Sequence, residues 1–304
     1  SFICSGNIAK AAQDHGCQVV LFDSENALDE DWLQALDVDT TPEKLLKIGV
    51  SMIDDVAKTL SDFMKDYKTN YSDLPYEEMP KLLFVIDSLG MLLTPTDVNQ
   101  FEKGDMKGDM GRKPKALKAL TSLVRNSVNM FGSYNVGLVA TNHTYASQDM
   151  FDPDDKISGG QGFIYASSIV VAMRKLKLKE DLDGNKVSTV QGIRAACKVV
   201  KSRYSKPFEG VQIKIPYESG MDPYSGLVDM LEAKGLLAKV GNKLSYVSPV
   251  TGEEIKEFRK GWTSDKLQVV IDEWEMNPEA EAIDVGDVDE NDMLDQMEDM
   301  ADES

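Results

Sequence analysis

Three apolar runs in the sequence end in side chains that can hold a metal ion or act on a phosphate group. A short, continuous apolar run is typical of a strand buried on both faces, as in a parallel sheet. Ligands of such sheets bind at the carboxyl ends of the strands, where an acid can hold a metal ion beside phosphates. The runs and the side chains that follow them are residues 19–22 with Asp23, Ser24 and Glu25, residues 82–86 with Asp87 and Ser88, and residues 136–140 with Thr141, Asn142 and His143. These types and positions predict a nucleotide-hydrolysing site.

The surrounding sequence predicts an α/β fold in which helices flank a mostly parallel sheet with an antiparallel extension. Strands and helices alternate first, and a strand-rich stretch follows, which favours this arrangement. The expected helices cover residues 2–15, 27–36, a segment capped by Ser51, 114–130 and 225–234, and the expected later strands cover residues 168–173, 195–200 and 211–215, with a hairpin turn at 181–186.

Two long loops with several glycines follow strands of this predicted sheet. They cover residues 99–113 and 144–162. Loops of this length inside a compact domain are usually either functional or disordered. Because both follow adjacent strand tips, we expect them to be functional.

The composition suits a globular protein of one large domain or two modest ones. The chain has 304 residues, of which 42% are hydrophobic, and no apolar stretch approaches the ~20 residues of a membrane span. We therefore expect no membrane partner. The three cysteines share no metal-ligand or redox spacing, which favours reduced thiols in a cytoplasmic protein.

The charge of the chain is concentrated at its C-terminal end. The net charge is −19, and residues 272–304 contain 15 acidic residues and no lysine or arginine, which leaves −4 for residues 1–271. Two interpretations remain open. The tail is either a disordered, solubilising segment, or a polyanion that competes with nucleic acid for a basic surface.

Six motifs, taken together, resemble the RecA family of recombinases. The motifs are LFDSENALD (21–29), LLFVIDSLG (82–90), ATNHTY (140–145), MFDPDDKISGGQG (150–162), VVKSR (199–203) and SGMDPYSGLVDM (219–230). No single motif is decisive, but their order, spacing and strand context are highly specific and cover roughly residues 17–237. The Asn-His pair and the Pro-Tyr phrase favour the phage branch over the bacterial one. The resemblance implies a RecA-type P-loop ATPase core that uses ATP and Mg²⁺.

The sequence departs from the family pattern at its start. The family's phosphate-binding loop is a glycine-rich turn that ends in lysine and a hydroxyl residue, and no such loop occurs in the 304 residues. Alignment back from Glu25 puts the end of that loop within about a residue of Ser1. We therefore expect an N-terminally truncated chain that also lacks the family's oligomerisation segment. Such a chain should hydrolyse ATP poorly or not at all.

The resemblance implies a role for several residues around the nucleotide. Glu25 matches the base that orients the attacking water, Asp87 matches the acid that holds Mg²⁺, and His143 matches the sensor of the γ-phosphate. Without these roles, they would be a surface acid, a turn cap and a histidine satisfied at a strand end. The resemblance also places Ser1, Asp29, Trp32 and Ser88 at the nucleotide, although Trp32 is alternatively a core residue of an amphipathic helix. Lys201 and Arg203 match a basic pair that reaches the ATP of the neighbouring protomer. Alternatively, these two residues are solubilising charges on an edge strand.

The two long loops correspond to the family's DNA-binding loops. Basic side chains in or after the first loop suit phosphate contacts, which give affinity that depends on salt and not on sequence. Glycines in the second loop allow close approach of the backbone, and an aromatic ring there could stack on bases. The implied DNA-binding residues are Arg112, Lys113, Lys115, Lys118, Phe151, Gly159, Gly160 and Gln161. Four aspartates in the second loop are unusual for a DNA surface, and the lysines are alternatively a solvated helix face.

Three functions remain open at this point. The first is an ATP-dependent recombinase that forms helical filaments on single-stranded DNA and pairs it with homologous duplex DNA. Its further partners would be phage mediator and single-strand-binding proteins, and its location the cytoplasm of a host cell. The second is another RecA-fold motor, such as a helicase. The third is a non-catalytic, truncated paralogue. The domains expected are a core over residues 1–217, a small subdomain over 218–271 and the acidic tail over 272–304.

Overall fold

The structure, a computed structural model, contains two compact units. It describes residues 1–103, 122, 125–127, 129–131, 133–145, 156–157, 162–180, 186–204, 209–218 and 220–276. The first unit is Ser1–Ser168 and the second is Ile169–Ser304. The domain boundaries that we expect after residues 217 and 271 stay predictions.

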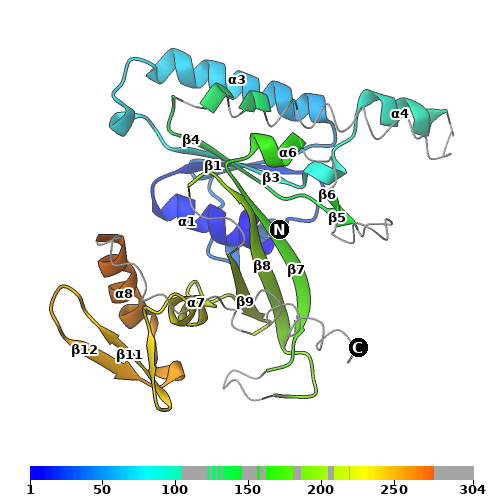
Figure 1. Ribbon diagram of the computed structural model, residues 1–304. Coiled ribbons are helices and arrows are strands. Elements are labelled where there is room, and N and C mark those ends of the chain that lie inside the picture. The colour runs from blue at the N-terminus through cyan, green and yellow to red at the C-terminus, as the bar shows by residue number, and fades with distance from the viewer. Residues whose placement is uncertain are drawn as a thin grey trace. The chain divides into compact units, whose positions relative to one another are not determined.

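A parallel four-stranded sheet forms the centre of the first unit (Figure 1). All three strands expected from the apolar runs are present, and a fourth strand extends the sheet. The strands of the sheet lie in the order β2-β1-β3-β4, and every pair of neighbouring strands is parallel. They are β1 (Gln18–Asp23), β2 (Leu45–Gly49), β3 (Leu82–Asp87) and β4 (Val136–Ala140).

Helices cover both faces of this sheet, because successive strand side chains point to opposite faces. Val20 and Phe22 pack with helix α3 (Ile53–Tyr71) in one apolar cluster. Val19 and Leu21 pack in a second cluster on the opposite face. Figure 1 shows α3 on one side of the sheet and α1 on the other. The helices of the second face are η1 (Phe2–Ile8), α1 (Ala9–Asp14) and α2 (Glu30–Gln34). The central strands β1 and β3 are buried on both faces and so fix the positions of the strand tips.

Three predicted element boundaries are wrong. Ser51 does not cap α3, because the helix begins at Ile53 and its N-cap residue is Met52. The helix expected at 27–36 is shortened to α2, where Asp29 is the N-cap. The first residues of the loop expected over 99–113 are helical instead. They belong to α4 (Pro95–Glu102), which begins after a capping box formed by Thr94.

The second unit contains the antiparallel extension that the sequence predicts. Strands β7 (Ile169–Leu178), β8 (Gly192–Ser202) and β9 (Gly210–Pro216) form an antiparallel sheet in that order. A bridge between Glu180 and Lys186 confirms the hairpin expected between β7 and β8. The expected helix after residue 225 is α7 (Leu227–Ala233), which ends before Gly235 at φ 72°.

A small apolar core follows along the chain in this unit. It joins α7 to a three-stranded antiparallel sheet and α8 (Ser264–Met276). The strands of this sheet are β10 (Ala238–Val240), β11 (Lys243–Val247) and β12 (Glu254–Glu257).

The remaining described elements of the chain are short. They are η2 (Tyr76–Glu78), η3 (Leu89–Met91), η4 (Arg259–Gly261), β5 (Thr144–Tyr145), β6 (Lys156–Ile157) and α6 (Gly162–Ala166).

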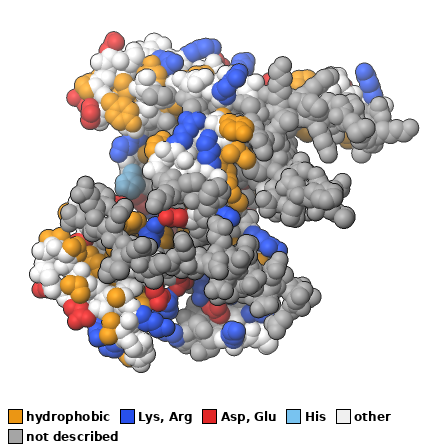
Figure 2. Space-filling model, in the orientation of Figure 1, with side chains coloured by type: hydrophobic (Ala, Val, Ile, Leu, Met, Phe, Trp, Pro, Cys, Tyr) orange, Lys and Arg blue, Asp and Glu red, His pale blue; other side chains and the backbone are white. Residues whose placement is uncertain are grey.

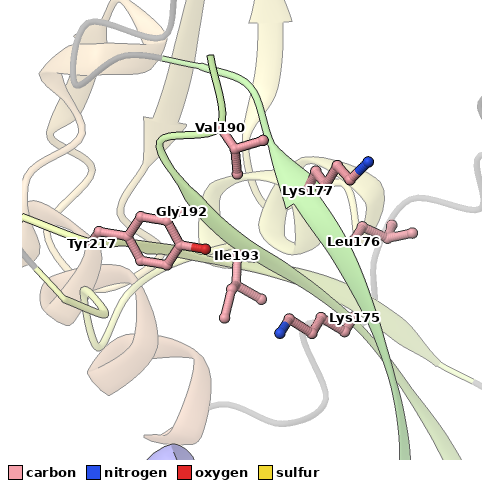
Figure 3. A pocket seen from close by; sticks show the side chains of 7 residues that line it. All are labelled: Lys175, Leu176, Lys177, Val190, Gly192, Ile193 and Tyr217. Atoms are coloured by element: carbon pink, nitrogen blue, oxygen red, sulfur yellow. The ribbon is translucent and has the colours of Figure 1, made fainter. Parts of the chain in front are cut away.

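A shallow pocket of about 240 Å³ lies against β7 and the start of β8 (Figure 3). It is lined by Lys175, Leu176, Lys177, Val190, Gly192, Ile193 and Tyr217. None of the site residues expected from the sequence lines it. On the face shown in Figure 2, hydrophobic side chains and side chains of both charges share the described surface. No helix among the described residues is long and apolar enough to cross a membrane.

Candidate functional site

The tips of the three predicted strands are neighbours at one edge of the sheet. Asp23 at the end of β1 pairs with Asp87 at the end of β3. Ala140 at the end of β4 pairs with Ile86. Parallel strands place all their carboxyl ends at the same edge, so the residues that follow them converge there.

Asp23 organises the turn that carries Glu25. Its side chain is 2% exposed, and its two oxygens accept the backbone N–H groups of Glu25 at 3.2 Å, Ala27 at 3.4 Å and Leu28 at 3.1 Å. The Lys47 ammonium lies 4.0 Å from Asp23 Oδ2 and also donates to the Leu28 carbonyl. A buried carboxylate with several N–H donors fixes the path of the turn.

Glu25, Ser88 and His143 meet in one hydrogen-bonded cluster. Ser88 Oγ donates to Glu25 Oε1 at 2.8 Å. His143 Nε2 lies 3.1 Å from Glu25 Oε1 and 3.1 Å from Ser88 Oγ. Residues 25, 88 and 143 come from three different strand tips, so the fold brings together side chains that are far apart in sequence.

This cluster is not the triad of a serine hydrolase. In such a triad the carboxylate bonds one ring nitrogen of histidine and the serine hydroxyl bonds the other. Here both Glu25 and Ser88 lie at the same nitrogen, Nε2 of His143. The arrangement therefore supplies a carboxylate that can orient water and an imidazole that can donate a hydrogen bond.

Asp87 is a buried acid held in its ionised form. It is 3% exposed, and its two oxygens accept from Thr141 Oγ1 at 2.6 Å and Ser5 Oγ at 2.8 Å. Burial raises the pKa of Asp87, but the hydrogen bonds that it accepts from Thr141 and then Ser5 act against burial, and the pKa is lowered from its ordinary value. The backbone nitrogen of Ser1 lies 3.6 Å from Asp87 Oδ2. The peptide bond between Asp87 and Ser88 is cis.

The groups around Asp87 fit a magnesium ion that is held mainly by phosphates and water. Mg²⁺ is usually bound by one or two carboxylates with substrate phosphates and not by an all-protein cage. Asp87 supplies one ionised carboxylate, and hydroxyl oxygens lie beside it. The described residues contain no group of three or more acids, histidines or cysteines that could hold a metal on its own.

Asp29 and Trp32 are placed by the start of α2. The Asp29 carboxylate accepts from the backbone N–H of Trp32 at 2.6 Å and so caps the helix. The Trp32 ring is half-buried and meets Phe2 edge-on, with ring centroids 6.4 Å apart. Trp32 also packs against the cluster that contains Leu33. Its role in packing is thus visible, and its expected contact with adenine stays a prediction.

Lys201 and Arg203 belong to the second unit. Lys201 lies in β8 and Arg203 directly after it. Partial desolvation, and then the positive charge of Arg203, lower the pKa of Lys201. The expected DNA-binding residues lie outside the described part of the chain: Arg112, Lys113, Lys115, Lys118, Phe151, Gly159, Gly160 and Gln161.

Ser5 and Gly90 were not expected near the site from the sequence, and Thr141 was expected only as a polar strand-tip residue with no assigned role. Ser5 and Thr141 hold Asp87, and Gly90 lies against the His143 ring, where an added Cβ would approach Cδ2 to 2.9 Å. Thr141 directly follows a predicted strand, which was the available signal. Ser5 lies 82 residues from Asp87 in sequence, and nothing local to either residue indicates their contact.

A parallel sheet flanked by helices, with two acids, a hydroxyl and an imidazole at its strand tips, defines an α/β protein built like the nucleoside triphosphatases. The chain belongs to the RecA family, since its residues 3–222 match the RecA N-terminal domain. It is 29% identical to the "Recombination and repair protein" of Enterobacteria phage T4 over 246 residues, which cover 80% of this chain and 57% of that protein.

Bacterial relatives show the same relationship. The chain is 27% identical to "Protein RecA" of Leptospira meyeri over 255 residues, 81% of this chain and 58% of that protein. It is 25% identical to "Protein RecA" of Cutibacterium acnes over 256 residues, 82% of this chain and 66% of that protein. The chain thus spans about three fifths of the length of these curated relatives.

Proposed function

We propose that this protein acts in an ATP-dependent DNA recombinase that forms filaments on single-stranded DNA and promotes homologous pairing and strand exchange. The observation that carries the proposal is the cluster of Glu25, Ser88 and His143 beside the ionised Asp87 in a chain of the RecA family. The relative from phage T4 is named as a recombination and repair protein, which supports the same role here.

Glu25 and Asp87 divide the proposed chemistry between them. Glu25 is 31% exposed on its side chain, so water can reach its carboxylate, and we assign it the orientation of the attacking water. Asp87 would hold Mg²⁺ through water, with Ser1 also at the nucleotide. Bound Mg²⁺ offsets the negative charge of the phosphates.

The remaining proposed nucleotide contacts come from both units. His143 would donate a hydrogen bond to the terminal phosphate, and Asp29 and Trp32 would contact the adenine. Lys201 and Arg203 would offset charge on the ATP of a neighbouring protomer, as arginine fingers do. This last role requires that the chain associates with copies of itself in a filament.

DNA is the proposed partner of the two long loops. The basic residues Arg112, Lys113, Lys115 and Lys118 would contact phosphates, and Phe151, Gly159, Gly160 and Gln161 would contact the strand in the second loop. Single-stranded DNA and homologous duplex DNA are the proposed substrates. We also propose mediator and single-strand-binding proteins as partners and the cytoplasm as the location.

The phosphate cradle is the part of an ATP site that the 304 residues do not contain. No stretch has the glycine-rich turn followed by lysine and a hydroxyl residue. We therefore expect these 304 residues alone to hydrolyse ATP poorly or not at all. The second candidate is a non-catalytic paralogue that binds DNA or protomers of an active recombinase.

Hydrolysis by a chain that carries a family-type phosphate-binding loop ahead of Ser1 tests the proposal. ATP hydrolysis is measured with and without single-stranded DNA, beside the variant Glu25→Gln, which keeps the size of the side chain. Strong stimulation by DNA that is lost in the variant supports the recombinase. Hydrolysis that DNA does not change favours another RecA-fold motor, and no hydrolysis favours the non-catalytic paralogue.

A further inference from the structure

Ser88 is the fixed member of the cluster that it forms with Glu25 and His143. The residue is 2% exposed, whereas the side chains of Glu25 and His143 are 31% and 57% exposed. The backbone of Ser88 is held on both sides by Ser24, whose hydroxyl accepts from its N–H and donates to its carbonyl, both at 2.7 Å. A buried, doubly held residue can orient its two more exposed neighbours.

The number of hydrogens in the cluster restricts how its three atoms can bond. An ionised carboxylate only accepts hydrogen bonds, and a hydroxyl has one hydrogen to donate. Because the Ser88 hydroxyl donates to Glu25 Oε1, it can only accept from His143. His143 Nε2 lies 3.1 Å from each of these two oxygens, so both contacts are satisfied only when Nε2 carries a hydrogen.

We propose that Ser88 is a positioning residue that, through Glu25, holds His143 in the tautomer with its hydrogen on Nε2. The ring is thereby kept as a hydrogen-bond donor at the strand tips. This inference rests on the proposed function, since the Nε2 hydrogen, which here points to Glu25 and Ser88, would pass to the terminal phosphate when a nucleoside triphosphate binds. It gives Ser88 a positioning role, because its one hydrogen bonds Glu25 and its oxygen lies at Nε2 of His143.

Gly90 leaves the space that this arrangement needs. An added Cβ at residue 90 would lie 2.9 Å from His143 Cδ2 and 3.1 Å from Asn142 Oδ1. The Asn142 side chain in turn accepts from the backbone N–H of His143 at 3.0 Å. The ring is therefore confined on the side of Gly90 and bonded on the side of Ser88.

Nitrogen NMR of histidine-labelled protein tests the tautomer without any need for hydrolysis. The 304 residues contain two histidines, His15 and His143, so each ring can be assigned by replacing the other. At a pH where both rings are neutral, we expect the His143 shifts to show hydrogen on Nε2 to a greater extent than those of His15. Ser88→Ala should move the His143 shifts toward those of His15, and Ser88→Thr or Ser88→Cys should restore them.

Ser245→Ala is the matched control, because the buried Ser245 hydroxyl also donates to a glutamate, Glu254, at 2.6 Å, and neither residue belongs to the cluster. We expect it to leave the His143 shifts unchanged. The proposal is overturned if His143 has the same shifts as His15 in the unaltered chain, or if Ser88→Ala changes nothing. It is also overturned if Ser245→Ala reproduces the effect of Ser88→Ala, since the hydroxyl of Ser88 would then not be the cause.

Kinetics in a chain with a phosphate-binding loop add a second readout. Misplacement of the ring and the carboxylate should lower kcat for ATP about tenfold or more in Ser88→Ala, with KM unchanged and activity recovered in Ser88→Thr. A raised KM with unchanged kcat would assign Ser88 to nucleotide binding and contradict the positioning role. If the unaltered protein does not hydrolyse ATP, the proposed function fails, while the tautomer result still decides the role of Ser88.

Discussion

The Asp23 carboxylate holds the backbone that carries Glu25, two residues further on, through an N–H···O bond of 3.2 Å. The same carboxylate accepts from the N–H of Leu28 and lies 4.0 Å from the Lys47 ammonium. A buried acid at the end of β1 therefore determines where the proposed base stands.

Replacement of Asp23 by alanine should destabilise the fold and the site together. It leaves the N–H groups of Glu25 and Leu28 without their acceptor, which costs about 1–3 kcal/mol in the free energy of unfolding. Urea denaturation measures this loss. The exposed Asp37, at φ 60°, gives a control, because Asp37→Asn suits that backbone conformation and should change stability little. Equal stability of both variants would contradict the role of Asp23.

Removal of the Thr141 hydroxyl should raise the pKa of Asp87 toward its ordinary value of 3.8. A carboxyl whose pKa is lowered by folding stabilises the native state above its unfolded-state pKa, and this stability is lost as the pH falls through the folded-state value. Thr141→Val removes the 2.6 Å bond, so it should lower the free energy of unfolding near neutral pH. As the pH falls, the free energy of unfolding should then decrease less in the variant than in the unaltered chain.

The measurement for Thr141→Val is the free energy of unfolding as a function of pH. Thr144→Val is a control that makes the same substitution at the next strand, β5, and should leave the acid dependence as it is. An acid dependence that is the same in Thr141→Val and the unaltered chain would show that the Thr141 bond does not hold Asp87 in its ionised form.

Gly90→Ala should displace the His143 ring from Glu25 and Ser88. The added Cβ would lie 2.9 Å from Cδ2, a distance that requires the ring to move. Because the ring is largely exposed, we expect little change in stability. In a chain that carries the phosphate-binding loop, DNA-stimulated hydrolysis should fall about tenfold or more. Gly49→Ala is the control, since its Cβ would approach nothing closer than 3.4 Å. Unchanged hydrolysis in Gly90→Ala would refute the confinement of the ring.

The strands and their tips could be predicted because their signal is local. The run from Leu82 to Ile86 is apolar without a break and ends in an acid, and β3 indeed ends at Asp87. The signal for the start of α4 is also local, in Thr94 and Asp97, although the glycines that follow favour a loop. Contacts made across the fold could not be predicted. Ser5 meets Asp87 over 82 residues, and no periodicity or composition indicates that pairing.

The proposed phosphate contacts in the first long loop predict an affinity for DNA that falls with salt. Lys115→Ala together with Lys118→Ala removes two cations from the proposed DNA surface. Affinity for single-stranded DNA should fall for every base sequence. The negative slope of log affinity against log salt should become less steep by about 0.7 for each phosphate that no longer has a cation beside it. Lys58→Ala with Lys65→Ala, on helix α3, is the matched control for the change in charge. An unchanged slope in Lys115→Ala/Lys118→Ala would show that these lysines do not contact phosphate.

Removal of the acidic segment should raise affinity for DNA if the segment competes for a basic surface. The cut belongs after Met276, because α8 continues to that residue and Glu273 accepts hydrogen bonds from Tyr246 at 2.7 Å and Ser248 at 2.9 Å. The removed residues 277–304 carry 12 acids and no lysine or arginine. Binding isotherms with single-stranded DNA should then show tighter binding that depends less on Mg²⁺, because the competing polyanion is gone. A matched control replaces the acids of the segment by asparagine and glutamine at constant length. Isotherms that are the same for all three chains would leave the segment with a solubilising role alone.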